Sequence, residues 1–329
     1  MILAGDIGGT HARLAFFQSQ NGPLTPVAEG VFPSREHRGL EEIVAQFIAA
    51  RSIRPDVACF GVAGPVRNGK VETSNLPWTV EASRLACELH LPSAILINDL
   101  EANAWGIASL GEHDLVPLNR VKSTPIGNQA VISAGTGLGE AGCFWNGKDY
   151  EIFASEGGHC DFAPRTELEI ELLRYLVARF GHVSFERIVS GPGLVNVYHF
   201  LRDTHRGEEP QWLADELAEG DAAATISRAA VVGKSVLAEH ALDLWISIYG
   251  AEAGNLALKL MATGGVFLGG GIAPKLVSKL SGPLFMQAFV SKGRLQPLLE
   301  SIPVKVITNE KIALFGAARY AVAKGMPKG

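Results

Sequence analysis

The stretch Gly5-Asp6-Ile7-Gly8-Gly9-Thr10 lies between two short apolar runs and decides how the N-terminal part of the chain folds. Ile2–Gly5 and Ala12–Phe17 are each typical of a strand, so the glycines between them predict a tight turn. Glycine lets the backbone aim several N–H groups at one point, which makes a nest for an anion. Thr10 adds a hydroxyl, and Asp6 at the strand end could hold Mg²⁺ directly or through water. An ordinary hairpin, in which Asp6 accepts from N–H groups of the turn, explains the stretch alone equally well.

The same pattern starts again near residue 130. Ala130–Ala134 and Ala141–Trp145 are typical of strands, and Gly135-Thr136-Gly137-Leu138-Gly139 separates them. This is not a dinucleotide fingerprint, because Glu140 stands where the last glycine is needed and no helix follows directly. Two glycine hairpins, one in each half of the chain, would suit a site that binds a polyphosphate from both sides. The repeat is short and could be chance, but it favours a duplicated lobe.

The rest of the chain predicts an α/β fold with parallel strands at its centre. Buried strands over Val57–Ala63 and Ala94–Ile97 follow an amphipathic helix that begins at Leu40, and one or two core helices are expected within Ala230–Met261. A chain of 329 residues suits two domains. We expect a small lobe of residues 1–109 plus 313–329, with the first phosphate turn, and a large lobe of residues 110–312.

Composition restricts the possible partners and the compartment. A net charge of −5 argues against nucleic-acid binding, which needs a basic face. The four cysteines show neither a CxxC pair nor a zinc spacing, which favours free thiols in a reducing cytosol. The N-terminus has no basic region before an apolar run, and the longest apolar stretches are too short to span a membrane. We therefore expect a cytoplasmic protein that binds no membrane.

Asn98-Asp99 follows the predicted strand Ala94–Ile97. Ligands of open α/β sheets bind at the carboxyl ends of strands, and a carboxylate there can accept the proton of a substrate hydroxyl. Alternatively, Asp99 caps a helix over Leu100–Leu110, and the residues alone favour this structural role.

Three further motifs carry polar groups or glycines in loops. In Ser155-Glu156-Gly157-Gly158-His159, the acid and the imidazole can both bind vicinal hydroxyls, unless this is a plain surface loop. Glu186 could be another hydroxyl acceptor or an acid at a helix start. Gly269-Gly270-Gly271 follows a strand and precedes a helix, so a flat ring could approach its backbone, although such turns are common.

In order and spacing, these motifs resemble those of the bacterial glucokinases from end to end of the chain. Gly181-His182-Val183-Ser184 and Ser190-Gly191-Pro192-Gly193 add to the resemblance. It implies the actin/hexokinase (ribonuclease H-like) ATPase fold, with two α/β lobes and with ATP and sugar in a cleft between them. It also implies transfer of the γ-phosphoryl group of ATP to the 6-hydroxyl of glucose, with Mg²⁺, by a homodimer.

The resemblance also implies roles for single residues. Asp99 resembles the general base for the 6-hydroxyl. The other sugar contacts would be Asn98, Glu156, His159 and Glu186. The phosphates would be lined by Gly8, Gly9, Thr10, Gly135, Thr136 and Gly137, and the adenosine by Gly269, Gly270 and Gly271.

One departure from the family pattern, one difference from related kinases and three alternatives remain. His11 stands where the family usually has Asn, which puts ATP affinity in question. The related repressor-and-kinase (ROK) sugar kinases have a zinc-binding cysteine cluster after a similar Gly-His, whereas only Cys160 follows here, so we expect no zinc. The sequence leaves open a kinase for mannose or glucosamine, a non-catalytic sugar sensor, and an actin-like ATPase that acts on protein. A sensor would need a DNA-binding extension, and a protein-directed ATPase has no reason to gather the sugar-type side chains.

Overall fold

The computed structural model describes residues 1–18, 24–73, 76–122 and 125–325. The predicted small-lobe range 313–329 therefore ends in residues that lie outside the described part. Two compact units are present. Unit 1 holds Met1–Asp114, Ile152–Ala154 and Asn309–Gly329, and unit 2 holds Leu115–Glu151 and Ser155–Thr308.

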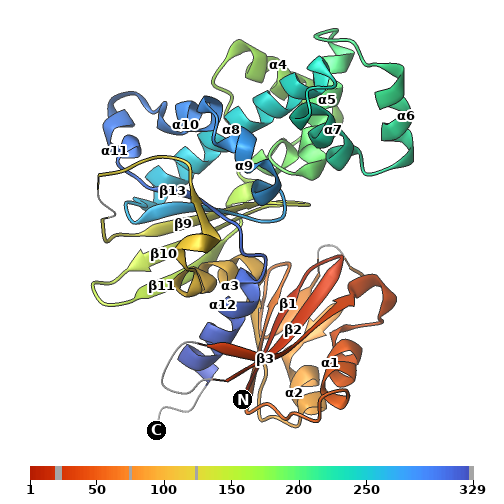
Figure 1. The fold of residues 1–329 in the computed structure, drawn as a ribbon, viewed down its shortest axis with the longest axis vertical. Coiled ribbons are helices and arrows are strands. Elements are labelled where there is room, and N and C mark those ends of the chain that lie inside the picture. The colour runs from red at the N-terminus through yellow and green to blue at the C-terminus, as the bar shows by residue number, and fades with distance from the viewer. Residues whose placement is uncertain (19–23, 74–75, 123–124, 326–329) are drawn as a thin grey trace. The chain divides into compact units, whose positions relative to one another are not determined.

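Unit 1 is built on a mixed sheet with the strand order β3-β2-β1-β4-β7 (Figure 1). β1 pairs antiparallel with β2 and parallel with β4, and β4 pairs parallel with β7. The strands are β1 (Ile2–Ile7), β2 (His11–Gln18), β3 (Thr25–Pro33), β4 (Val57–Val62) and β7 (Ile95–Asn98), and a separate hairpin is formed by β5 (Lys70–Glu72) and β6 (Thr79–Glu81). The carboxyl ends of β1, β4 and β7 thus lie at one edge.

Helices cover both faces of this sheet. This is expected for central strands such as β4, whose residues are buried on both faces. The helices are α1 (Leu40–Ala49), α2 (Ala82–Leu89), α3 (Asp99–Gly106) and α12 (Ile312–Tyr320), with short turns at Ser34–Glu36, Ile107–Ser109 and Glu112–Asp114 and a π-helical turn at Ala321–Gly325. Leu3 and Ile7 point into the core under α1 and α2, whereas Ile2 and Ala4 point into the core under α3 and α12. Figure 1 shows these helix pairs on opposite faces.

α3 and α12 pack against each other at glycines. A Cβ on Gly316 would lie 1.7 Å from the carbonyl oxygen of Ala102, and one on Gly106 would lie 2.3 Å from that of Ile312. The two backbones therefore touch directly, and α3 is fixed in place by the last regular helix of the chain.

Unit 2 repeats the strand arrangement. Its sheet has the order β11-β10-β9-β12-β13-β8, in which β9 and β10 form an antiparallel hairpin and β12 is parallel to β9 and β13. The strands are β8 (Leu115–Pro117), β9 (Gln129–Ala134), β10 (Leu138–Trp145), β11 (Tyr150–Ser155), β12 (Gly265–Gly269) and β13 (Val304–Ile307). The restart predicted near residue 130 is confirmed by this pairing.

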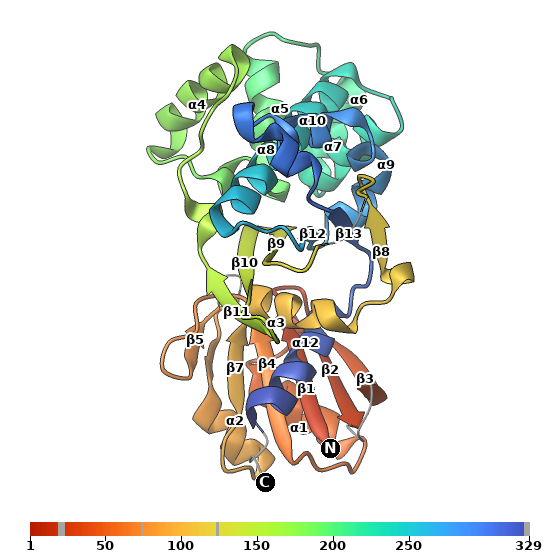
Figure 2. The same ribbon diagram turned by 90° about the vertical axis from the view of Figure 1, so that its left-hand side faces the viewer.

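A large helical layer packs on the sheet of unit 2 (Figure 2). Its helices are α4 (Glu167–Phe180), α5 (Gly191–Asp203), α6 (Gln211–Glu219), α7 (Ala222–Val231), α8 (Val236–Leu260), α9 (Val277–Leu280), α10 (Pro283–Val290) and α11 (Gln296–Glu300), with short turns at Gly157–His159, Phe185–Arg187, Ala273–Leu276 and Gly293–Leu295. α8 is the central one. Its Trp245 donates to the carbonyl oxygen of Ser190 at 3.1 Å, and its Tyr249 donates to that of Ile132 in β9 at 3.2 Å.

Two helices share the range Ala230–Met261, where one or two are expected: α7 ends at Val231, and α8 runs without a break from Val236 to Leu260. Among the described residues, none of the helices combines the length and the apolar character needed to cross a membrane.

Candidate active site

The first glycine turn joins β1 to β2 and is fixed from below by a buried serine. Gly8 donates its N–H to the carbonyl oxygen of His11 at 3.0 Å. Ser34 donates its hydroxyl to the carbonyl of Gly8 at 2.8 Å and its N–H to that of Thr10 at 2.9 Å. Thr10 and the side chain of His11 remain exposed. The turn therefore has a fixed backbone and an open outer side.

Asp6 lies at the end of β1, opposite Arg13 of β2 in the strand register. A guanidinium nitrogen of Arg13 is 3.5 Å from the carboxylate, so Asp6 contacts a cation rather than N–H groups of the turn. Burial raises the pKa of Asp6, and the charge of Arg13 opposes this shift. Asp6 is thus a partly buried carboxylate with one charged neighbour.

The second polar motif ends β7 and begins α3. The side chain of Asn98 caps the helix, since its oxygen accepts from the N–H groups of Leu100 at 2.8 Å and Glu101 at 3.4 Å. Its Nδ2 donates to the carbonyl of Gly64 at 3.1 Å. The structural alternative that Asp99 is the cap was wrong, because Asp99 is the first helical residue and is half-buried. A carboxylate oxygen of Asp99 accepts from the N–H of Leu100 at 3.0 Å.

Both motifs of unit 1 lie at the same edge of its sheet. Asp6 pairs with Gly61 across β1 and β4, and Val62 pairs with Asn98 across β4 and β7. A Cβ on Gly61 would lie 2.8 Å from that of Ala102, so α3 comes close to the strands. The first turn and the Asn98-Asp99 pair are therefore separated only by the end of β4.

The second glycine turn joins β9 to β10 in unit 2. Gly135 donates to the carbonyl of Gly137 at 2.8 Å, and its own carbonyl accepts the N–H of Gly191, the first residue of α5, at 2.8 Å. A Cβ on Gly135 would meet nothing within 4 Å, and Thr136 is exposed. This turn too has a fixed backbone and an open side.

The third glycine motif ends β12 and lies against the second turn. A Cβ on Gly270 would be 2.4 Å from the carbonyl oxygen of Ala134, the residue before Gly135, and Gly270 has φ +80°. A Cβ on Gly269 would be 2.5 Å from the hydroxyl of Ser133. Gly271 faces open space. Only glycine fits at Gly270, where the obstacle is backbone, so the motif and the second turn pack directly against each other.

Glu156, His159 and Glu186 come together in unit 2. The imidazole of His159 has Nδ1 at 3.8 Å from a carboxylate oxygen of Glu156 and Nε2 at 3.6 Å from one of Glu186. The other oxygen of Glu186 accepts the N–H of Leu138 at 2.9 Å, and a Cβ on Gly137 would come within 2.5 Å of it. Glu186 lies in the first turn of the short helix Phe185–Arg187, as its structural alternative expects, but its carboxylate accepts from Leu138 and so joins this cluster to the second glycine turn.

Comparisons with known proteins agree with this arrangement. A sequence profile of the glucokinase family matches residues 3–324. The chain belongs to the glucokinase family. The glucokinase of Nostoc sp. (strain PCC 7120) is 43% identical over 337 residues that cover 98% of each chain.

Solved structures of this family share the fold. The crystal structure of a glucokinase from an Antarctic psychrotroph has a TM-score of 0.84 at 30% identity and covers 98% of this chain and 99% of its own. A glucokinase from Balamuthia mandrillaris, in complex with glucose, has a TM-score of 0.78 at 22% identity and covers 98% and 93%. The expected actin/hexokinase ATPase fold is confirmed, and the chain is an ATP-dependent sugar kinase.

Several residues of this glucokinase-family site give no signal in the sequence. Ser34 and Arg13 fix the first turn and Asp6, Gly64 anchors Asn98, and Glu140 lies under the loop that carries Glu156. Ser34 and Gly64 act through partners that are 26 and 34 residues away in the sequence, and Arg13 through pairing of β1 with β2, so no local pattern identifies them. The strand register would have been needed to find them.

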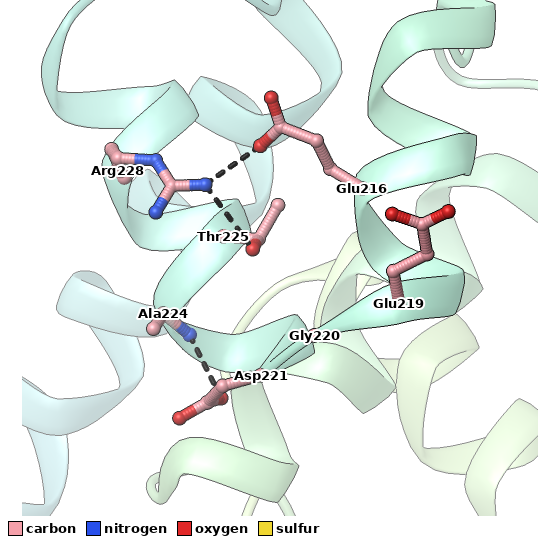
Figure 3. A pocket seen from close by; sticks show the side chains of 7 residues that line it. All are labelled: Glu216, Glu219, Gly220, Asp221, Ala224, Thr225 and Arg228. Atoms are coloured by element: carbon pink, nitrogen blue, oxygen red, sulfur yellow. Dashed lines mark hydrogen bonds and ion pairs between the residues drawn. The ribbon is translucent and has the colours of Figure 1, made fainter.

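A shallow hollow of about 450 Å³ also lies outside the predicted residues. It is lined by Glu216, Glu219, Gly220, Asp221, Ala224, Thr225 and Arg228 (Figure 3). Arg228 contacts Glu216 at 2.6 Å there, and Asp221 caps α7. Its lining is mostly acidic, so it does not suit the phosphates of the nucleotide. The described residues contain no group of three or more His, Cys, Asp or Glu side chains that could hold a metal ion.

Proposed function

We propose that this glucokinase-family kinase transfers the γ-phosphoryl group of Mg-ATP to the 6-hydroxyl of glucose, with the residues of the two glycine turns and the polar clusters in the roles given below. The observation that carries the proposal is Glu186. One oxygen of its carboxylate faces His159 and the other accepts the N–H of Leu138 at the second glycine turn. A sugar-type cluster and an anion-binding turn are therefore parts of one structure.

In unit 2, Glu156, His159 and Glu186 are proposed to bind the sugar hydroxyls. Their side chains are 64%, 62% and 31% exposed, so they are accessible to a ligand. A buried acceptor or donor that loses its hydroxyl partner is left unpaired, and for this reason such sites reject sugars with an inverted or missing hydroxyl. Gly135, Thr136 and Gly137 are proposed to contact the phosphates, and Gly269, Gly270 and Gly271 the adenosine.

In unit 1, Asn98 is proposed to bind the sugar, and Asp99 to be the general base. A sugar hydroxyl is a far weaker acid than a carboxylic acid, so Asp99 would first orient the hydroxyl and take its proton late, in a loose transition state. The cap by Asn98 sets the position of Asp99, because it fixes the first turn of α3.

The first glycine turn is proposed to contact phosphate oxygens through Gly8, Gly9 and Thr10. Magnesium enters with the nucleotide as part of the substrate, and Asp6 is proposed to hold it directly or through water. The neighbouring Arg13 keeps part of the Asp6 carboxylate occupied, which favours contact through a water molecule.

Four wider properties complete the proposal. The small lobe is taken as residues 1–109 plus 313–329, and the large lobe as residues 110–312. The protein is expected to act in the cytoplasm as a homodimer and to need no zinc.

The test is a coupled assay with Mg-ATP and separate glucose, mannose, fructose, glucosamine and N-acetylglucosamine. We expect turnover with glucose to exceed that with each other sugar. A higher kcat/KM with mannose or glucosamine would make the chain a kinase for that sugar. Folded, ATP-binding protein that turns over none of them would overturn the proposal in favour of a sensor.

A further inference from the structure

Two neighbouring carboxyl groups are buried in unit 2, and one of them, that of Glu140, lies against the loop that carries Glu156 and His159. Glu140 lies in β10 and is 1% exposed, and Glu252 lies in α8 and is fully buried. Two neighbouring carboxylates cannot both be ionised in such a site without a large cost, so one proton is shared between them.

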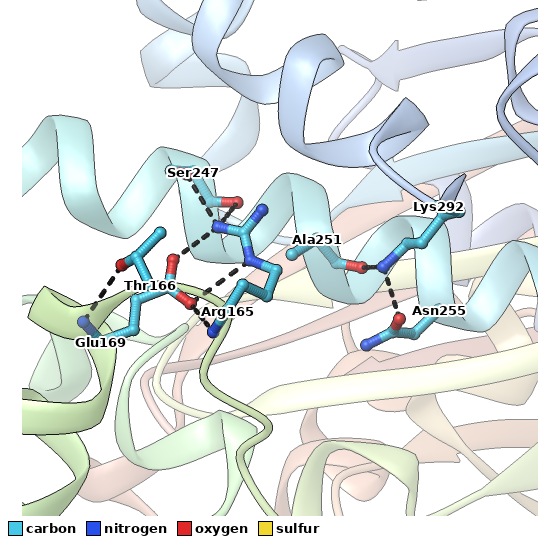
Figure 4. Close-up of polar contacts among 7 residues, drawn as sticks. All are labelled: Arg165, Thr166, Glu169, Ser247, Ala251, Asn255 and Lys292. Carbon is cyan, nitrogen blue, oxygen red and sulfur yellow. Dashed lines mark hydrogen bonds and ion pairs between the residues drawn. The ribbon is translucent and has the colours of Figure 1, made fainter. Parts of the chain in front are cut away.

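Glu252 is the member of the pair that keeps the negative charge. Asn255 donates to it at 2.8 Å and Lys259 at 3.2 Å. Lys292 in turn contacts the side-chain oxygen of Asn255 and donates to the carbonyl of Ala251 at 2.9 Å (Figure 4). A buried carboxylate with an ammonium group and an amide donor is stable as an anion.

Glu140 has no comparable partner. Its Oε1 is buried, and among the described residues no group donates a hydrogen bond to it. Burial and then the neighbouring charge of Glu252 raise the pKa of Glu140 to about 8, against a weaker effect of Lys259. The other titratable groups that interact with this pair are Tyr249, Lys292 and, through Lys259, the thiol of Cys160. At neutral pH Glu140 is therefore a carboxylic acid, whose O–H can donate to Glu252.

The sugar loop, defined as Ser155–His159, lies directly on Glu140. A Cβ on Gly157 would be 1.9 Å from Oε2 of Glu140. The hydroxyl of Ser155 donates to the carbonyl of Glu140 at 3.0 Å and accepts the N–H of Gly157 at 3.3 Å. The backbone of the loop therefore touches both the side chain and the main chain of this one residue.

We propose that Glu140, in its neutral form beside Glu252, is the positioning residue that holds the sugar loop in the conformation that binds the sugar. This rests on the proposed role of Glu156 and His159. Ionisation of Glu140 would place a second negative charge next to Glu252. Water or a cation would then have to reach the pair, and the closely packed loop above it would have to move.

The consequence is a specific pH dependence. With a pKa of about 8, Glu140 is mostly neutral at pH 7 and mostly ionised at pH 9. If only the neutral form holds the loop, the apparent affinity falls in proportion to the fraction of that form, which is roughly tenfold over this range. Saturating glucose draws the loop back to its binding conformation, so kcat changes by less than about twofold.

The experiment measures KM for glucose, kcat and glucose binding by tryptophan fluorescence from pH 7 to pH 9. The wild type is compared with Glu140→Gln, which keeps the shape and a donor but cannot ionise. We expect the wild-type KM and dissociation constant to rise about tenfold, and those of Glu140→Gln to stay constant. With Glu252→Gln the rise should begin at lower pH, because the charge that raises the pKa of Glu140 has been removed.

Glu169→Gln is the matched control. Glu169 is another buried glutamate of unit 2, at the start of α4, and Arg165 donates to it at 2.6 Å (Figure 4). This variant should keep the wild-type pH profile. The inference, but not the proposed function, would be overturned by either of two results. One is a wild type that phosphorylates glucose with a KM constant from pH 7 to pH 9, and the other is a Glu140→Gln profile equal to that of the wild type. Absence of glucose phosphorylation by the wild type at pH 7 would instead overturn the proposed function.

Discussion

Gly158 lies where no side chain fits, and this decides the shape of the sugar loop. A Cβ there would be 1.9 Å from the carbonyl oxygen of Leu138. The obstacle is backbone, so no change of rotamer can relieve it. The two consecutive glycines of the loop are therefore required by the close approach of the loop to β10, and not by flexibility.

We expect Gly158→Ala to raise the glucose KM by at least tenfold, roughly the effect of a 1.4 kcal/mol loss of binding energy. The added methyl group must push the loop off β10 and move Glu156 and His159. Steady-state kinetics measure this. Gly220→Ala is the control, since its Cβ would meet only ordinary contacts at 3.6 Å. An unaltered KM for Gly158→Ala would show that the loop position does not matter for the sugar.

Asp99→Asn tests the general base. The amide keeps the size of the side chain but cannot accept the proton, so kcat should fall about 10²–10⁴-fold while glucose still binds. Glu101→Gln removes a charge from the same first turn of α3 and is expected to keep most of the activity. Near-normal turnover of Asp99→Asn in the coupled assay would exclude Asp99 as the base.

The sequence names candidate residues of the site, whereas the contacts that hold them come only from the structure. Asn98-Asp99 was recognised as a pair, yet the cap was assigned to the wrong member. Both side chains have an oxygen that can cap, and only the backbone at the end of β7 decides which one faces the helix. Ser34 and Glu140 were not found, because their contacts join segments distant in sequence.

At the scale of elements, the short turn Phe185–Arg187 connects two functional segments through Glu186. Its carboxylate accepts the N–H of Leu138 at the start of β10, next to Gly137. The strand hairpin that carries the second glycine turn is therefore held by a residue that also faces His159. Neither segment can shift without affecting the other.

We expect Glu186→Ala to raise KM for both glucose and ATP, the first by loss of a hydroxyl contact and the second because the N–H of Leu138 loses its partner. An unpaired buried group costs about 1–3 kcal/mol, so each KM should rise roughly 5- to 100-fold. Glu156→Ala is the matched comparison and should affect KM for glucose only. A Glu186→Ala variant with a normal KM for ATP would contradict the link.

Elements with a clear period or a glycine boundary were predictable from sequence. The two strand–turn–strand units were correct, because apolar runs on both sides of clustered glycines leave few alternatives. The sequence predicts one or two helices within Ala230–Met261, and the break between α7 and α8 falls at Gly233-Lys234-Ser235, where Gly233 has φ +69°. The cap of α8 by Ser235 determines where the second helix begins.

For the whole molecule, each unit repeats the same strand order around its own hairpin and has its own core. The sequence predicts this only as a short echo near residue 130. The parallel pairing of β12 with β9, far apart along the chain, is a long-range property that no local pattern specifies.

The shared proton at Glu140 also affects the stability of the whole chain. The pKa of Glu140 is about 8 in the folded protein and near 4.5 in a free side chain. Between these values the folded state binds one more proton than the unfolded state, so the free energy of unfolding falls as pH rises from 4.5 to 8. Glu140→Gln lacks this loss. The difference in the free energy of unfolding between Glu140→Gln and the wild type, measured by urea unfolding, should therefore shift in favour of the variant by ~2 kcal/mol or more from pH 5 to pH 9. An equal pH dependence of both proteins would contradict the raised pKa.

The contact between α3 and α12 has a consequence for how the protein is made. The helix that carries Asp99 is complete early in synthesis, but the partner that meets its backbone at Ala102 and Gly106 comes from residues 312–320, near the end of the chain. A nascent chain still on the ribosome therefore has α3 without the helix that supports it. Packing of this helix must wait until residues 312–320 have been made.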